Sequence, residues 1–268
     1  MRNKPQAVLL NEQKIKSGVP DFLGEIVVLD QIESTNDYFK DPKKRHEKPS
    51  VCIAEMQTKG RGRFDRLWHS PHFENVYFSL CYRFKKTVQA LSGLSLIIGL
   101  AVCKTIETII QLPDILFIKW PNDILIDEKK IAGILVEIAA TSSAFSDVIM
   151  GIGINVNMAE ITENKISQSW SSLYKITGNQ IDRNLLCAKL IFNLMHYLEN
   201  FSKNGFEYFA EEWQKRDYLF EKPVAMSLNQ NHIEGVGAGI DAQGCLVLKM
   251  PDGKKHTFSA AEATLIKK

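Results

Sequence analysis

The stretch ILFIKWPNDILIDEKKIAGILVEI, residues 115–138, decides the fold class of this 268-residue chain. It predicts a strand over 115–118 and then a hairpin, in which 124–126 pairs with 131–138 around the polar turn at 127–129. Two strands joined by so short a turn run antiparallel. Because the larger part of the chain mixes such locally joined strands with helices, we predict an α+β fold with a mixed sheet.

Apolar residues follow helical spacing from 88 to 109, and Lys104 and Glu107 are the only charged residues in that stretch. We therefore expect this helix to be buried against the sheet. Its uncharged part, 88–103, is too short for a membrane span and contains polar residues, so we expect a cytoplasmic protein without a membrane segment. The other predicted elements are strands over 25–30, 51–56, 75–83 and 148–156, a short helix that begins at Ser34 or Thr35, and a long helix that begins at 182–184, breaks near 204–205 and resumes through Trp213.

The character of the chain changes after Tyr218. Short strand-like runs follow, separated by polar turns at 229–231, 241–244 and 251–253. Turns every ~8–12 residues predict a small all-β barrel. We divide the chain into an N-terminal lead (1–24), a large α+β domain (25–220) and a small barrel (221–268).

Composition excludes several classes of protein. Lys+Arg number 33 and Asp+Glu 31, so the net charge of +2 gives no field for holding a polyanion by bulk charge. The five cysteines are far apart and form no C-x-x-C pair, which favours reduced thiols over disulfides or zinc. The six histidines lack ligand spacing, so we assign no metal ligand to the protein. The P-loop, G-x-S-x-G and H-E-x-x-H motifs are absent.

The loop QTKGRGRFDRLW, residues 57–68, has arginines at 61, 63 and 66 with glycines at 60 and 62. Glycine permits close backbone approach, and arginine offers planar, bidentate donors to phosphate or carboxylate. We favour binding of a small anionic ligand here. Nucleic-acid binding and a plain surface loop are the alternatives.

Three weaker motifs follow. The segment 119–123, KWPND, is either a tight turn or a fixed lysine beside an acidic residue. The segment 129–137 is either an ordinary hairpin or a lysine beside small residues that leave room for a ligand. The segment 151–157, GIGINVN, lacks the third glycine of a dinucleotide site and predicts instead a strand whose backbone contacts a flat ligand, with amides from Asn155 and Asn157.

Taken together and in this order, these segments resemble the biotin protein ligase family. The segments are Ser34-Thr35-Asn36, Gly60-Arg61-Gly62-Arg63, Lys119-Trp120-Pro121-Asn122-Asp123, Lys130-Ile131-Ala132-Gly133-Ile134-Leu135 and Gly151-Ile152-Gly153-Ile154-Asn155. The resemblance implies a catalytic domain similar to class II synthetases with a C-terminal SH3-like barrel. It also implies that biotin and ATP give biotinyl-5′-AMP and pyrophosphate, with Mg²⁺ on the nucleotide, and that a lysine of a biotin carboxyl carrier protein, as in acetyl-CoA carboxylase, accepts the biotinyl group.

The resemblance assigns roles residue by residue. The biotin-binding residues are Ser34, Thr35, Asn36, Gln57, Gly60, Arg61, Gly62, Arg63, Lys130, Gly133 and Leu135. The residues that bind ATP and the adenylate are Arg63, Arg66, Trp68, Lys119, Asn122, Gly153, Asn155 and Trp170, although Trp170 is equally well explained as a core residue. The catalytic residues are Arg61, Arg63, Lys119, Asp123 and Lys130. Arg61, Arg63, Lys119 and Lys130 are cations, which suit a reaction between two anions. Asp123 is the candidate for orienting the acceptor lysine or taking its proton.

Two departures from the family pattern change the expectations. Phe64-Asp65 stands where many relatives have a basic residue and glycine, so we expect altered retention of the adenylate. Ile266 stands where some relatives have an arginine, so no residue of the tail is assigned.

Two other functions are alternatives. A lipoate-type ligase or acyl transferase of the same fold is the alternative enzyme, but the 60–63 loop and the KWPND segment favour biotin. A biotin-sensing repressor needs a DNA-binding module, for which residues 1–24 are too few, so we expect no nucleic-acid partner. The resemblance alone suggests a homodimer through the central sheet.

Overall fold

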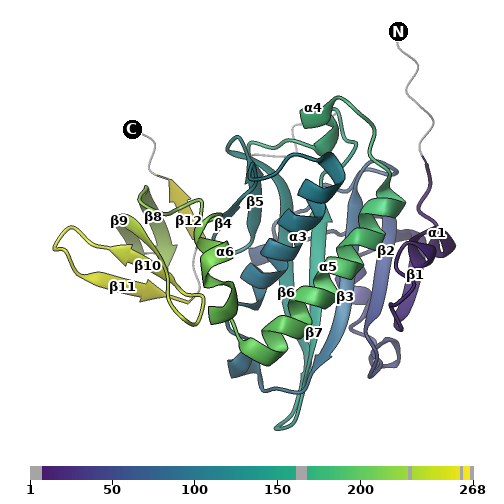
Figure 1. Ribbon diagram of the computed structural model, residues 1–268, viewed down its shortest axis with the longest axis horizontal. Coiled ribbons are helices and arrows are strands. Elements are labelled where there is room, and N and C mark those ends of the chain that lie inside the picture. Colours follow the sequence, from purple (N-terminus) through teal and green to yellow (C-terminus); the bar gives the residue numbers. More distant parts are fainter. Residues whose placement is uncertain (1–7, 161–167, 229–230, 260–261, 266–268) are drawn as a thin grey trace.

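The computed structural model describes residues 8–160, 168–228, 231–259 and 262–265. These residues form two sheets, which follow one another along the chain. The larger has the strand order β1-β2-β3-β7-β6-β5-β4, and the smaller has the order β11-β10-β9-β8-β12. Figure 1 shows the smaller sheet beside the end of the larger one that carries β4 and β5.

The larger sheet is mixed, as predicted, because β1 and β2 are parallel while its other neighbouring strands are antiparallel. The predicted hairpin is confirmed: β5 and β6 are joined by Asp127 and Glu128, which have φ values of 46° and 61°. Two left-handed residues make a turn that matches the twist of the paired strands. The strands of this sheet are β1 (Glu25–Ile32), β2 (Ser50–Gln57), β3 (Val76–Phe84), β4 (Phe117–Lys119), β5 (Asp123–Ile126), β6 (Lys129–Thr141) and β7 (Ser146–Ile154).

Two long helices, α3 (Leu94–Ile110) and α5 (Arg183–Asn204), lie side by side over one face of this sheet (Figure 1). Ile97 and Leu194 are fully buried in the core that these layers enclose. The stretch Val88–Ile110 has the length and hydropathy of a membrane-spanning helix, and 61% of its apolar window is buried within the fold. The prediction of a buried core helix is therefore confirmed.

The ends of the helices follow local sequence signals. Asp182 caps α5 by accepting hydrogen bonds from the amides of Asn184 and Leu185, and the helix ends at Gly205, as predicted. The helix predicted over 88–109 is interrupted instead. Gly93 has a φ of 79°, which separates the 3-10 turn η3 (Val88–Leu91) from α3.

The N-terminal lead contains a helix that periodicity did not predict. This helix, α1 (Glu12–Ser17), is capped by the side chain of Asn11, and its Ile15 is fully buried. Six residues are too short a window for a helical pattern to be read. The other short helices are α2 (Thr35–Tyr38), η1 (Pro42–Lys44), η2 (Arg63–Asp65), α4 (Leu173–Thr177), η4 (Glu207–Phe209) and α6 (Ala210–Gln214).

The smaller sheet is antiparallel throughout and contains β8 (Pro223–Leu228), β9 (Asn231–Ile240), β10 (Leu246–Lys249), β11 (Lys255–Phe258) and β12 (Glu262–Leu265). The turns predicted at 241–244 and 251–253 are confirmed, whereas positions 229–230 lie outside the described residues. In the described part of the chain no ladder joins β11 to β12, so the closed barrel remains a prediction. Trp120 fixes this sheet to the larger one, because its indole Nε1 donates to the carbonyl of Gly244 at 3.1 Å.

Candidate active site

A cavity of about 700 Å³ lies on the face of the large sheet that presents Gly133 and Gly153, whereas Ile134, the neighbour of Gly133 on the opposite face, packs against Gly99 of α3. Its floor comes from β6 and β7, and its walls come from α2, the 61–69 loop, the 119–123 turn and the segment around Trp170. The predicted site residues that line it are Ser34, Thr35, Asn36, Gln57, Arg61, Gly62, Arg63, Arg66, Trp68, Lys119, Asn122, Asp123, Lys130, Gly133, Leu135, Gly153, Asn155 and Trp170. Gly60 lies just behind the lining, where its carbonyl accepts a hydrogen bond from the amide of Trp68 at 2.9 Å.

One end of the cavity is a buried network of neutral polar groups. The amide and hydroxyl of Thr35 both donate to Gln57 Oε1, at 2.9 and 3.1 Å. Ser79 Oγ lies within 2.8 Å of Thr35 Oγ1 and donates to Asn36 Oδ1 at 2.6 Å. Ser79 was not predicted, since a single serine within a strand carries no signal until the strand is placed beside α2.

Asn36 is held from three sides. Its Nδ2 donates to Glu137 Oε2 at 2.6 Å and lies 3.4 Å from the carbonyl of Leu135. Below it is Gly151 of β7, where a Cβ would lie 2.3 Å from Asn36 Oδ1. The first glycine of the 151–157 motif therefore makes room for a protein side chain, and Asn36 is 3% exposed.

The side chain of Arg61 does not point at the cationic end of the cavity. Its guanidinium donates twice to Asp37, both at 2.7 Å, and also to Glu137 at 2.9 and 3.2 Å. This hydrogen-bonded guanidinium lowers the pKa of Asp37 to about 2. The sequence predicted that Arg61 neutralises reacting anions, whereas the structure pairs it with two carboxylates of the protein.

Two residues after Arg61 have an unusual backbone conformation. Phe64 and Asp65 have φ values of 56° and 54°, in the left-handed region that favours glycine. These are the two residues by which the sequence departs from the family pattern. The guanidinium of Arg63 lies 4.9 Å from the centre of the Phe64 ring, which itself is 65% exposed.

Trp68 lies flat on the glycines of the floor. A Cβ on Gly153 would lie 2.4 Å from the indole Cε2, and one on Gly133 would lie 3.0 Å from its Cζ3. These two glycines face each other across β6 and β7. The sequence predicted a flat ligand against this backbone, but here the flat group is an indole, whose buried Nε1 has no hydrogen-bond partner among the described residues.

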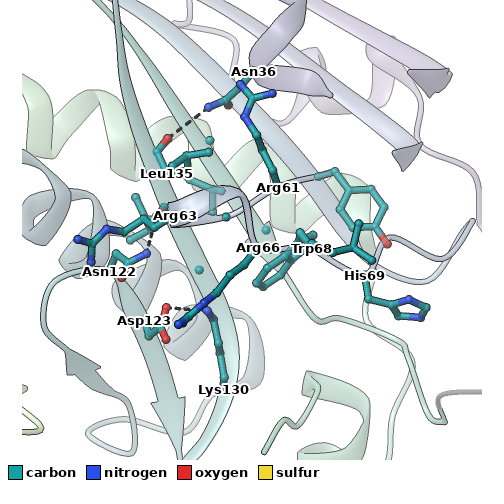
Figure 2. Close-up of a pocket in the computed structure, with 18 of the residues that line it drawn as sticks. Asn36, Arg61, Arg63, Arg66, Trp68, His69, Asn122, Asp123, Lys130 and Leu135 are labelled. Carbon is teal, nitrogen blue, oxygen red and sulfur yellow. Dashed lines mark hydrogen bonds and ion pairs between the residues drawn. The ribbon is translucent and has the colours of Figure 1, made fainter. Parts of the chain in front are cut away.

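The opposite end of the cavity is charged. Lys130 Nζ lies 2.6 Å from Asp123 Oδ1, and both side chains are less than 20% exposed. The same ammonium lies 5.3 Å from the centre of the Trp68 ring. Lys119, opposite Asp123 in the β4–β5 register, lines the same space. Figure 2 shows Asp123 and Lys130 at one end of the cavity and Asn36 with Arg61 at the other.

The remaining predicted amides mainly hold the walls together. Asn122 Nδ2 donates to the carbonyl of Ile134 at 2.9 Å, which ties the 119–123 turn to β6. Asn155 Nδ2 donates to the carbonyl of Ser171 at 3.1 Å, beside the cavity. The prediction for Asn157 is wrong, because both ends of its side-chain amide bond the backbone of Ile181 away from the lining.

The chain is similar in sequence to proteins of a known family. A model of the Biotin/lipoate A/B protein ligase family matches residues 28–155. The bifunctional ligase/repressor BirA of Escherichia coli (strain K12) is 35% identical over 257 residues, which cover 96% of this chain and 78% of that protein. The chain belongs to the biotin/lipoate A/B protein ligase family.

Other similarities to members of this family extend over most of the chain. The biotin–[acetyl-CoA-carboxylase] ligase of Mycobacterium tuberculosis is 31% identical over 215 residues, 79% of this chain and 77% of that protein. The biotin protein ligase of Aquifex aeolicus, solved in complex with biotin and ATP, superposes with a TM-score of 0.76 at 28% identity. That superposition covers 91% of this chain and 99% of the other. The shared fold therefore extends beyond the large sheet to most of the chain.

Proposed function

We propose that this family member is a ligase that activates biotin with ATP and transfers it to a lysine of a biotin carboxyl carrier protein. The single observation that carries the proposal is the cavity, which joins an end that contains the hydroxyl and amide groups of Thr35 and Gln57 to an end that contains Lys119, Asp123 and Lys130. Biotin combines a neutral ureido ring with a carboxylate tail, and ATP brings phosphates. The names of the relatives and the biotin–ATP complex of the Aquifex protein support the same reaction.

We assign the ureido ring of biotin to the end of the cavity that contains Thr35 and Gln57. Thr35, Gln57 and the backbone of 60–63 are the polar groups available there, with Ser34 beside them. We place the valeryl tail between that end of the cavity and Lys130. Because Lys130 carries three donors, it can bind the biotin carboxylate and remain paired with Asp123.

Adenylate formation joins two anions. A carboxylate oxygen of biotin attacks the α-phosphorus of ATP, the bond from that phosphorus to the β-bridging oxygen breaks, and pyrophosphate leaves with the electron pair. Lys119, Lys130 and Arg63 surround the space where this occurs, and fixed positive charges stabilise the charge that develops on the phosphoryl oxygens. No enzyme nucleophile takes part.

Transfer to the carrier follows at the same place. The lysine amine attacks the acyl carbon of the adenylate, the carbon–oxygen bond to AMP breaks, and the amine loses a proton. We assign to Asp123 the role of orienting this amine or accepting its proton, since Asp123 is held at the cationic end by Lys130. We assign Trp170, Asn155 and Trp68, which line the same cavity, to the nucleotide side.

We expect Mg²⁺ to arrive with the nucleotide. Among the described residues, no group of three histidine, cysteine, aspartate or glutamate side chains is placed to hold a metal ion. Asp123 is the acidic side chain at the cationic end, and one carboxylate together with substrate phosphates is a donor set that Mg²⁺ accepts. When bound, the ion neutralises phosphate charge.

Three further parts of the proposal concern the whole protein. The chain divides into a lead (1–24), a catalytic domain (25–220) and a C-terminal unit (221–268) that closes as an SH3-like barrel; its five-stranded antiparallel sheet supports this. The protein acts in the cytoplasm, where carrier proteins and ATP are present. It acts without nucleic acid, and its large sheet pairs two copies into a homodimer.

Pyrophosphate exchange into ATP tests the proposed activity. We expect exchange that depends on biotin and is lost when biotin is replaced by lipoate. Exchange with lipoate but not with biotin would assign the chain to the other branch of the family. Absence of exchange with either acid would contradict adenylate formation.

A further inference from the structure

Arg61, Asp37 and Glu137 form a charged clamp at the end of the cavity that contains Asn36, Thr35 and Gln57. The two terminal nitrogens of the guanidinium bond both carboxylates, at distances between 2.7 and 3.2 Å. Arg61 is 20% exposed, and the carboxylates are 31% and 29% exposed. The three residues come from three segments: the 61–69 loop, α2 and β6.

The charges of the clamp disfavour an anionic ligand at this guanidinium. One positive group faces two negative groups, and Lys40, which also pairs with Asp37 at 2.6 Å, lies on the exposed side. A phosphate or carboxylate that bound Arg61 would have to displace Asp37 or Glu137 from the guanidinium and leave the displaced carboxylate unpaired. The clamp therefore suits a structural task better than anion binding.

Glu137 extends the clamp to a second group. Its Oε2, which contacts Arg61, also accepts the hydrogen bond from Asn36 Nδ2 at 2.6 Å. Asn36 in turn accepts from Ser79. The position of Arg61 in the loop and the position of Asn36 at the start of α2 are thus fixed by the same carboxylate on β6.

We propose that Asp37 and Glu137 are positioning residues, which hold the backbone of residues 60–63 against the bound ring of biotin through the side chain of Arg61. This inference rests on the proposed function and assigns the Arg61 side chain to substrate positioning rather than to charge neutralisation. The loop is then anchored at its base, while Arg63 and Arg66 line the rest of the cavity.

Steady-state pyrophosphate exchange with the variants Asp37→Asn and Glu137→Gln tests the clamp. Glutamine at 137 keeps an oxygen that can accept from Asn36 while removing the charge that holds Arg61. We expect both variants to raise the KM for biotin by ~10-fold to ~100-fold, the range that corresponds to the loss of one hydrogen bond to a charged group, with little change in the KM for ATP. We also expect more AMP to form without carrier protein, because a loose loop lets the adenylate escape.

Asp147→Asn is the matched control. Asp147 accepts two hydrogen bonds from Arg83, at 2.7 and 2.9 Å, and this pair lies on the same sheet face outside the cavity lining. The Asp147→Asn substitution removes a comparable ion pair. A change in KM that came from lost stability alone would therefore appear in all three variants. We expect the KM for biotin to stay at the wild-type value in this control.

A double-mutant cycle shows whether Asp37 acts through Arg61. We expect Asp37→Asn to have no further effect on the KM for biotin in an Arg61→Gln background, and Arg61→Lys to fail as a substitute because an ammonium lacks the planar fork. An active wild-type enzyme whose KM for biotin is unchanged by Asp37→Asn and Glu137→Gln would overturn the clamp. Improved ATP binding in those variants would also overturn it, since it would show that the carboxylates compete with the nucleotide for Arg61. A wild-type chain without exchange would instead overturn the proposed function.

Discussion

The indole of Trp68 rests on the backbone of Gly153, so closely that a Cβ on Gly153 would lie 2.4 Å from the indole Cε2. This contact brings a loop residue to the centre of the sheet face where the substrates are proposed to bind. It also gives the 151–157 motif a physical reason: Gly151 makes room for Asn36 and Gly153 makes room for Trp68.

Gly153→Ala is therefore expected to lift the indole from the floor. Overpacking of this kind costs about 1–3 kcal/mol of stability. Thermal or urea unfolding measures the loss, and tryptophan fluorescence reports the displaced ring. In a Trp68→Ala background the same substitution should cost little. An equal cost in both backgrounds would show that the indole is not the group that Gly153 accommodates.

Substitutions at Lys130 and Asp123 are expected to affect adenylate formation and transfer to the carrier protein differently. Lys130→Met removes the cation nearest the proposed carboxylate position, and we expect pyrophosphate exchange to fall by about 10²–10³-fold. Asp123→Asn keeps the shape of the site and should preserve exchange more fully than transfer to the carrier protein. Normal transfer by the Asp123→Asn enzyme would remove Asp123 from the transfer step.

The cysteines are expected to react unequally with a thiol reagent. Burial raises the pKa of the Cys52 and Cys81 thiols to about 12, and burial also raises the pKa of Cys103 and Cys187. Cys245 is the partly exposed one. Titration with Ellman's reagent near pH 8 should modify Cys245 first, with the other four reacting only on unfolding. Rapid reaction of several thiols in the folded protein would contradict their burial.

Asp37 is expected to contribute to acid stability with a definite sign. Its pKa of about 2 in the folded protein lies below the ordinary value of ~3.9, so its stabilising effect is present above the ordinary pKa and is lost as the pH falls toward 2. Asp37→Asn should flatten that part of the stability curve, measured by urea unfolding between about pH 4 and pH 2. An unchanged acid limb would show that the Arg61 pair is not formed in solution.

Much of the site follows from short-range sequence signals. The strand, turn and hairpin pattern of 115–138 places Lys119, Asp123 and Lys130 at one end of the sheet, and the glycines at 60 and 62 mark the loop that covers it. Each of these signals lies within a few residues along the chain, where periodicity and turn chemistry are informative.

The clamp and the tryptophan contact depend on long-range neighbours. Arg61 meets Asp37 across 24 positions and Glu137 across 76 positions, so neither carboxylate could be linked to it before the strand order was known. The floor under Trp68 requires the β6–β7 register as well as the path of the loop. Local patterns located the charged residues but could not decide which of them pair with one another.

Mass spectrometry of a purified biotin carboxyl carrier domain, incubated with this protein, ATP, Mg²⁺ and biotin, measures the proposed transfer itself. We expect the mass gain of one biotinyl group, on one lysine, that disappears when ATP or biotin is omitted and is strongly reduced with Lys130→Met. A carrier domain that a known biotin protein ligase modifies, but that shows no mass gain with this protein, would show that the chain is not a biotin ligase for that carrier class.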